Sequence, residues 1–191
     1  PDEKKNQVIC VNRLTYHKGV DQTIAICRLI QDLMGDNAPE FVFVSTGSEQ
    51  WYVQMLQETA KSWLKKVTFT GWVDNYTKMR LIKQSKVLLD NEWPEGFGGM
   101  CLAEALWAGT QPIAWERRSK REVYPAGLNM VQKSPDLWDS MRAMAEVAVG
   151  YLTEDPYRPP DPSVKEFLRE KRSHESHAKG ILEVLEKITG K

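Results

Sequence analysis

The sequence predicts an α/β fold, a Rossmann-like parallel sheet with helices on both faces. Short apolar segments alternate along the chain with longer segments in which apolar residues recur every three or four positions, the period of a helix packed on a sheet. The short segments are apolar throughout, without the polar alternation of a half-exposed strand. Strands that are apolar on both sides are typical of a parallel sheet covered by two layers of helices.

The elements follow one another in strict alternation. Strands are predicted at residues 8–11, 41–44, 67–69, 86–89, 113–115 and 130–131. Helices are predicted at residues 20–34, from Ser48 as N-cap to 64, from Asp74 as N-cap to 84, at 100–107, within 116–123, and from Ser134 or Asp136 as N-cap to 152. Residues 1–155 therefore form the sheet domain, and residues 156–191 a proline-rich linker followed by helices at 163–172 and 175–188.

Composition excludes several classes of protein. The 26 basic and 26 acidic side chains cancel, which argues against non-specific nucleic-acid binding. No apolar run reaches the length of a transmembrane segment, and the polar first residues are unlike a signal peptide, so we expect a cytoplasmic protein. Cys10, Cys27 and Cys101 lie far apart, which favours buried free thiols over a disulfide frame or a metal site.

In a parallel sheet of this kind, ligands bind beyond the carboxyl ends of the strands, where the strand order reverses. The segments that follow strands are residues 12–19, 45–49, 71–74 and 91–100. The last of these contains a glycine-rich bend, Gly96, Gly98 and Gly99, which leads from a strand into a helix that begins at Met100. Amide groups and about half a positive charge at such a helix start attract an anion.

Two carboxylates, Glu95 before the bend and Glu104 in the helix, frame this predicted anion site. Carboxylates are unfavourable beside an isolated anion, but they can accept hydrogen bonds from hydroxyl groups. A ligand with both phosphates and hydroxyls, such as a nucleotide sugar, fits both features.

Arg13 and Lys18 follow the first strand and could balance the roughly two negative charges of a diphosphate, which amides alone cannot do. The alternative is a pair of surface cations beside a turn. The cations of residues 117–121 alternate with Glu116 and Glu122 and are interpreted as a solvated face, with contact to an anionic acceptor as the alternative. A dinucleotide fingerprint fails because Cys101 stands where its third glycine is needed, and no P-loop sequence is present.

Six short motifs resemble, in their order, the donor-binding half of the retaining glycosyltransferases of the GT-B fold, carbohydrate family 4 or glycosyl transferases group 1. They are Asn12-Arg13-Leu14 with Tyr16-His17-Lys18-Gly19, Thr46-Gly47-Ser48-Glu49, Thr70-Gly71-Trp72-Val73, Glu95-Gly96-Phe97-Gly98, Ala103-Glu104-Ala105 with Ala108-Gly109, and Gln111-Pro112-Ile113-Ala114. The resemblance covers about residues 7–188.

The resemblance implies a role for each matching residue. Arg13 and Lys18 would bind the donor diphosphate, Glu95 would lie beside the transferred sugar as the catalytic residue, and Glu104 would bind the ribose hydroxyls. The loop around Val73 would lie near the nucleobase. The remaining implied donor-binding residues are Gly47, Gly96, Phe97, Gly98, Gly99 and Met100.

The resemblance also implies the reaction: transfer of a hexose from a UDP-, GDP- or ADP-linked sugar with retention at the anomeric carbon, without cofactor or metal. The acceptor-binding domain of such enzymes precedes the donor half and is absent here, so the chain alone should be inactive, and its terminal helices would pack back on that missing N-terminal domain. Peripheral membrane attachment through that domain is an open possibility.

One departure from the family pattern leaves two alternatives open. Glu95 and Glu104 are one residue farther apart than is usual in the family, and the neighbouring Glu92 could take the place of Glu95. The longer spacing also favours a second interpretation of the chain, a catalytically inactive nucleotide-sugar binding or regulatory module.

Overall fold

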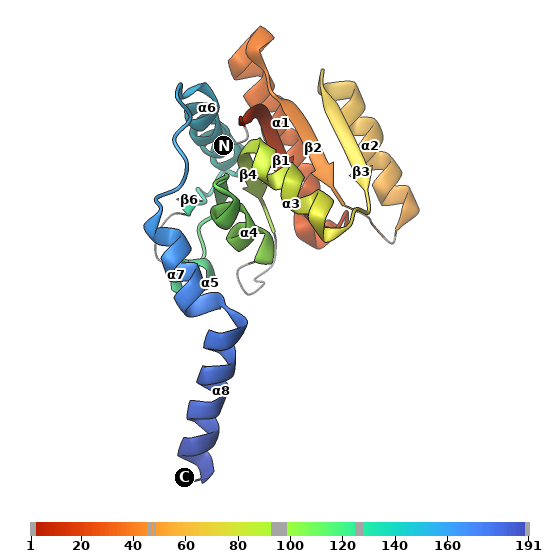
Figure 1. Cartoon of the computed structure of the whole chain (residues 1–191). Coiled ribbons are helices and arrows are strands. Elements are labelled where there is room, and N and C mark those ends of the chain that lie inside the picture. Colours follow the sequence, from red (N-terminus) through yellow and green to blue (C-terminus); the bar gives the residue numbers. More distant parts are fainter. Residues whose placement is uncertain (1–2, 46, 48, 93–98, 125–127, 190–191) are drawn as a thin grey trace. The chain divides into compact units, whose positions relative to one another are not determined.

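Six parallel strands form one sheet in the order β3-β2-β1-β4-β5-β6 (Figure 1). The computed structural model describes residues 3–45, 47, 49–92, 99–124 and 128–189. The strands are β1 (Lys5–Cys10), β2 (Glu40–Val44), β3 (Val67–Gly71), β4 (Ser85–Asp90), β5 (Gln111–Trp115) and β6 (Asn129–Val131).

The α-helices alternate with these strands, as the sequence predicts. They are α1 (Val20–Met34), α2 (Gln50–Trp63), α3 (Asn75–Gln84), α4 (Met100–Ala108), α5 (Arg118–Val123) and α6 (Leu137–Thr153). Two short 3₁₀ turns, η1 (Tyr16–Lys18) and η2 (Gly35–Asn37), flank α1. The chain divides into two units, residues 1–160, which contain the sheet, and residues 161–191, which contain α7 (Ser163–Arg172) and α8 (His174–Thr189).

Strand order reverses between β1 and β4. The chain builds outward from β1 to β2 and β3, then returns through α3 and places β4 on the other side of β1. Helices α1, α2 and α6 cover one face of the sheet, and α3 and α4 cover the other (Figure 1). The connection after β1 leads to α1 on one face of the sheet, and the connection after β4 leads to α4 on the other face. The segments after these two strands therefore diverge and leave room for a ligand.

Burial confirms that the sheet is covered on both faces. Ile9, Leu88 and Ile113, in three neighbouring strands, have no exposed surface. The ring centroids of Phe43 in β2 and Phe69 in β3 lie 4.8 Å apart in a stacked arrangement. These contacts explain why the short apolar segments form strands although they carry no period of their own.

Two of the predicted N-caps are decided by hydrogen bonds. The Asp74 carboxylate accepts the amide of Thr77 at 2.9 Å, which confirms the cap and holds the pKa of Asp74 below its usual value. Asp136, rather than Ser134, caps α6 and accepts the amide of Trp138 at 2.7 Å.

Ser48, the predicted N-cap of α2, lies outside the residues that the structure describes. The helix begins at Gln50 after an extended Glu49, which makes no capping hydrogen bond with its side chain. Tyr52 and Leu56 are buried on the inner face of α2.

Residues 156–160 are attached to the sheet unit by Tyr157. Its hydroxyl accepts the amide of Gln111 at 3.0 Å and donates to the carbonyl of Lys86 at 2.8 Å, at the amino-terminal side of β5 and β4. The boundary between the two units consequently falls after Pro160. In the second unit, α7 and α8 contact each other.

At Gly19, the start of α1 approaches the end of β4 closely. Its φ of +59° is left-handed, and a Cβ on this residue would stand 2.5 Å from the carbonyl oxygen of Asn91. A real Cβ does not approach a carbonyl oxygen that closely, so only glycine allows the two segments to meet.

We predict that Gly19→Ala destabilises the protein more than Gly109→Ala. Both glycines are left-handed, and alanine in that conformation costs about 1–2 kcal/mol. A Cβ at Gly109 has only an ordinary contact 4.0 Å from Pro159, whereas the clash at Gly19 adds about 1–3 kcal/mol. Urea unfolding of both variants measures the difference, and equal losses would contradict the close approach.

Candidate functional site

A cavity of about 410 Å³ opens at the carboxyl ends of β1, β2 and β3 and at the start of α4. Six of the sequence-predicted donor-binding residues line it: Arg13, Lys18, Val73, Gly99, Met100 and Glu104. They come from the segments after β1 and β3 and from α4 with its N-cap. The fold thus brings together residues that lie far apart in the sequence, at the place where strand order reverses.

The other predicted site residues have different outcomes. Glu95, Gly96, Phe97 and Gly98 lie outside the residues that the structure describes. Gly47 is not among the described residues that line the cavity; a Cβ on it would meet the carbonyl oxygen of Leu14 and the side chain of Val53, both at 2.5 Å. Its place in the motif is explained by this close packing.

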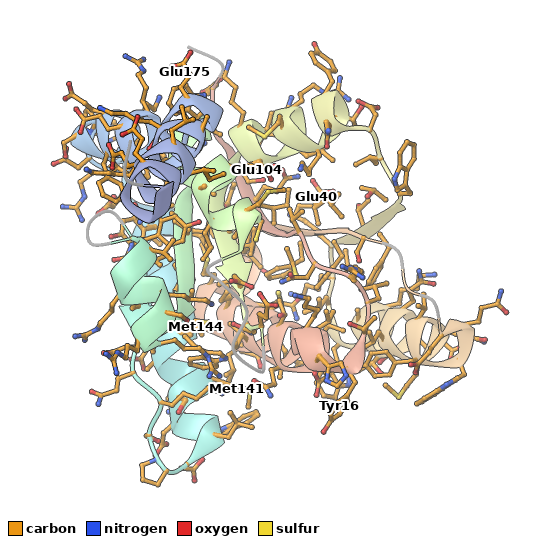
Figure 2. All side chains as sticks on the ribbon, turned by 90° about the horizontal axis from the view of Figure 1, so that it is seen from below. Tyr16, Glu40, Glu104, Met141, Met144 and Glu175 are labelled. Atoms are coloured by element: carbon orange, nitrogen blue, oxygen red, sulfur yellow. The ribbon has the colours of Figure 1, made fainter. Side chains whose placement is uncertain are left out.

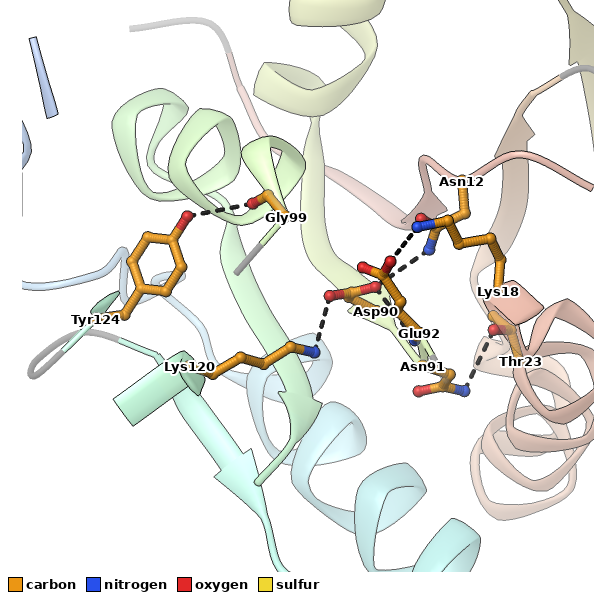
Figure 3. Close-up of polar contacts among 9 residues, drawn as sticks. All are labelled: Asn12, Lys18, Thr23, Asp90, Asn91, Glu92, Gly99, Lys120 and Tyr124. Carbon is orange, nitrogen blue, oxygen red and sulfur yellow. Dashed lines mark hydrogen bonds and ion pairs between the residues drawn. The ribbon is translucent and has the colours of Figure 1, made fainter. Parts of the chain in front are cut away.

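Each described carboxylate of the cavity is paired with a lysine. Lys78 of α3 donates to Glu104 of α4 at 2.6 Å, and both side chains are mostly buried. Lys18 forms an ion pair with Glu92, the residue that could substitute for Glu95 (Figure 3). Among the described residues, Arg13 has no ion-pair partner.

The balance of charge in the cavity is positive. Three cationic side chains and two carboxylates are among its described lining residues, which leaves a surplus of one positive charge. The start of α4 adds roughly half a charge of the same sign. Such a site favours a ligand with net negative charge, while its two carboxylates can accept hydroxyl groups.

Beneath the cavity lies a buried ion pair that the sequence analysis missed. Lys120 of α5 donates to Asp90, the last residue of β4, at 3.0 Å, and the side chains are 2% and 0% exposed (Figure 3). The interpretation of residues 117–121 as a solvated face is therefore wrong for Lys120. It holds for Arg121, which is 64% exposed and pairs with Glu116.

Of the three residues that the sequence analysis missed, one carried a signal in the sequence. An aspartate at the end of the apolar strand β4 needs a partner if it is buried, so Asp90 could have been singled out. Lys78 and Lys120 carry no such signal, because each reaches its partner only through the packing of a helix. Lys78 is one turn into α3, on an otherwise ordinary polar helix.

The three cysteines are free and buried, as predicted. Cys101 lines the cavity, but burial and the nearby Asp90 raise its pKa well above the usual value. Burial likewise raises the pKa of Cys10 to about 12. Both groups therefore remain protonated thiols at neutral pH and are poor nucleophiles.

A second cavity of about 370 Å³ lies beside the start of α1 and the segment before α6, where Tyr16, Gln22 and Lys133 line it. Tyr16 is 73% exposed and points outward on the side opposite to Glu104 (Figure 2). The ammonium of Lys133 lies 5.1 Å from the ring centroid of Trp115. Burial, together with the neighbouring cations Arg117 and Lys120, lowers the pKa of Lys133 to about 8.

With this geometry established, the chain can be assigned to a family. Residues 1–142 match the family model of the glycosyl transferases group 1, and the chain belongs to that family. A search of curated proteins gave no match. No helix in the described part of the chain is long and apolar enough to cross a membrane.

Solved structures of glycosyltransferases share the fold. A mutant of TarM from S. aureus, solved with fondaparinux, α-GlcNAc-glycerol and UDP, is similar with a TM-score of 0.76 and 18% identity over 96% of this chain and 36% of TarM. HepE from Anabaena, solved with UDP-glucose, gives 0.75 and 18% over 96% of this chain and 49% of HepE. The C-terminal domain of the group 1 protein LpcC from Francisella tularensis gives 0.70 and 15% over 90% and 89%. The chain therefore spans between a third and a half of TarM and HepE.

We predict that Lys133 titrates near pH 8 in the folded protein, against an ordinary value of 10.5. Between these two pH values the unfolded chain binds more protons at this residue, so its contribution to the free energy of unfolding rises with pH. NMR of ¹³C-labelled lysine, assigned with Lys133→Met, measures the titration. A midpoint near 10.5, or an equal pH dependence of unfolding in both proteins between pH 8 and 10, would contradict it.

Proposed function

We propose that this chain binds a nucleoside diphosphate sugar in the cavity after β1 and β4 and acts as the donor half of a retaining hexosyltransferase. One observation carries the proposal: Arg13, Lys18 and Glu104, which are remote in the sequence, line one cavity. A cationic pair and a carboxylate in one cavity suit a ligand that is anionic at one part and rich in hydroxyls at another.

The diphosphate would bind to Arg13, Lys18 and the first amides of α4. A diphosphate diester carries roughly two negative charges, more than the half charge of a helix start can balance. Lys18 is already held beside the cavity by Glu92, so a diphosphate would replace a carboxylate as its partner. That exchange keeps the ammonium paired in both states, and it releases Glu92 from its ion pair with Lys18.

The ribose would bind to Glu104. One oxygen of this carboxylate is taken by Lys78 at 2.6 Å, which limits the rotation of the group and leaves its second oxygen for hydroxyl groups. Val73, from the segment after β3, lines the same cavity and would contact the nucleobase. TarM and HepE were solved with UDP or UDP-glucose, which makes uridine the first base to test, with guanosine and adenosine as the alternatives.

The chemical step would break the bond between the anomeric carbon and the diphosphate oxygen. Arg13, Lys18 and the α4 amides would stabilise the negative charge that grows on the leaving diphosphate, so the proposal needs no metal ion or cofactor. Glu95 would orient the hexose and oppose positive charge at its ring. The acceptor hydroxyl would then attack from the face that the diphosphate leaves and pass its proton to the departing diphosphate oxygen, with retention of configuration.

The acceptor would bind to a second domain, which precedes the donor half in the proposal. The partial coverage of TarM and HepE by this chain supports that arrangement, as does LpcC, whose C-terminal domain matches almost in full. The 191-residue chain alone would then bind the donor and transfer nothing.

The longer glutamate spacing supports a second candidate, a nucleotide-sugar binding module that is inactive even in its full-length protein. Both candidates predict nucleotide binding. Assay of the full-length protein with a panel of UDP-, GDP- and ADP-sugars separates them, because only the enzyme releases the nucleoside diphosphate in the presence of an acceptor.

We predict that calorimetric titration of the 191-residue chain detects binding of UDP, GDP or ADP. Arg13→Ala should weaken binding by about tenfold to a hundredfold, the value of a charge-assisted hydrogen bond. Arg28→Ala is the matched control, because Arg28 pairs with Asp32 on the exposed face of α1 and should change nothing. If none of the three nucleotides binds at millimolar concentration, the diphosphate site is wrong.

We predict that Glu104→Gln weakens binding of UDP by about tenfold and leaves binding of 2′,3′-dideoxy-UDP nearly unchanged, because only the first ligand has hydroxyls for the carboxylate. Glu58→Gln, at an exposed residue of α2 bonded to Gln54, is the control. Titration of both ligands measures the effect. Equal losses for both ligands would show that Glu104 acts on the cavity as a whole and not on the ribose.

A further inference from the structure

Two side chains at α5 reach the edge of the nucleotide cavity from outside it. Lys120 of α5 donates to Asp90 at 3.0 Å, and the hydroxyl of Tyr124, the residue after α5, donates to the carbonyl of Gly99 at 3.1 Å (Figure 3). Neither Lys120 nor Tyr124 is among the described residues that line the cavity, and both side chains are buried. Of their partners, Gly99 lines the cavity, and Asp90 bonds to two residues that line it, Asn12 and Glu92.

Asp90 connects Lys120 to two residues that line the cavity. Its Oδ2 accepts from Lys120, while its Oδ1 accepts the side-chain amide of Asn12 at 3.2 Å and the backbone amide of Glu92 at 3.4 Å. Asn12 and Glu92 both line the cavity, and Glu92 in turn holds Lys18. One oxygen of Asp90 is therefore held by Lys120 of α5, and the other oxygen orients Asn12 and Glu92, which line the cavity.

Gly99 connects Tyr124 to the first turn of α4. It is the N-cap of α4, and its carbonyl also accepts the amide of Leu102 at 3.0 Å, which closes the first turn of the helix. A Cβ on Gly99 would lie within 3.9 Å of Asp90 and Glu92. The residues connected to Lys120 and the residue connected to Tyr124 are therefore neighbours. The amides of this turn are those that would face an anion.

We propose that Asp90 and Tyr124 are positioning residues of the nucleotide cavity: Asp90, whose charge Lys120 balances, orients Asn12 and Glu92, and Tyr124 acts through Gly99 on the first turn of α4. This inference rests on the proposed function for its effect on binding. Core stability alone does not explain the ion pair of Lys120 and Asp90, because buried ion pairs are often replaced by apolar residues without loss of stability. What apolar residues cannot supply is the acceptor oxygen that Asp90 presents to Asn12 and to the Glu92 amide.

Two double variants of the 191-residue chain separate positioning from packing. Lys120→Met with Asp90→Asn removes both charges but keeps a side-chain oxygen that can accept from Asn12 and Glu92. Lys120→Met with Asp90→Leu removes the charges and the acceptor. Both avoid the unpaired buried charge that a single substitution would leave, and urea unfolding of each shows which protein remains folded. Arg121→Met, at the exposed cation of α5, is the control.

The first measurement needs no ligand. Amide hydrogen exchange by NMR should be about tenfold faster at Glu92 in the leucine variant than in the asparagine variant, while amides of β1 and β2 exchange equally in both. Tyr124→Phe should accelerate exchange at Leu102 by a similar factor without changing Glu92. Equal exchange at Glu92 in the two folded double variants overturns the inference for Asp90, whether or not any nucleotide binds. If the leucine variant does not fold, Tyr124→Phe decides: unchanged exchange at Leu102 overturns the inference.

The second measurement is the affinity for UDP, GDP and ADP. The asparagine variant and Arg121→Met should bind the preferred nucleotide as the wild type does, and the leucine variant and Tyr124→Phe should bind it about tenfold more weakly. Equal affinity across the folded variants overturns the positioning role. Absence of binding by the wild type instead contradicts the proposed function, and the exchange rates then decide the inference alone.

Discussion

Asp90 carries a carboxylate without any exposed surface at the end of β4, and the residues around it are arranged to satisfy that charge. A buried ion costs several kcal/mol of lost hydration unless a counter-charge and further hydrogen bonds compensate it. Lys120 supplies the counter-charge from α5, and Asn12 and the backbone of Glu92 supply the remaining donors. Segments from three parts of the sequence thereby meet at the point where strand order reverses, and the cavity opens above them.

In the described part of the cavity, each acidic side chain already has a cationic partner. Lys18 holds Glu92, and Lys78 holds Glu104. A ligand with phosphates and hydroxyls suits these pairs. Its phosphate oxygens can take the place of the Glu92 carboxylate at Lys18, and its hydroxyls can donate to the Glu104 oxygen that Lys78 does not use. Two carboxylates and a helix start thus share one small space, with a lysine beside each carboxylate.

The rigid and the ligand-facing parts of the sheet unit are joined by close backbone contacts. Gly19 lets the start of α1 approach the carbonyl of Asn91, and Gly47 packs against Leu14 and Val53 in a space that a larger residue would not fit. Two of the glycines in the family motifs are therefore explained by packing between segments, apart from any contact with a ligand.

The sequence alone determined the alternation of strands and helices, because hydrophobic period and burial on both faces depend on local composition. Helix α1 matches its predicted bounds, and Asp74 caps α3 as its position before the helix indicates. The motif order also indicated that Arg13, Lys18 and Glu104 belong to one site, since residues that follow parallel strands share one edge of the sheet. Tertiary structure alone decided that Gly47 packs against Leu14 and Val53. It likewise decided that Lys120 is buried against Asp90 and that Lys78 holds Glu104, because such partners lie on separate elements and are brought together only when helices pack on the sheet.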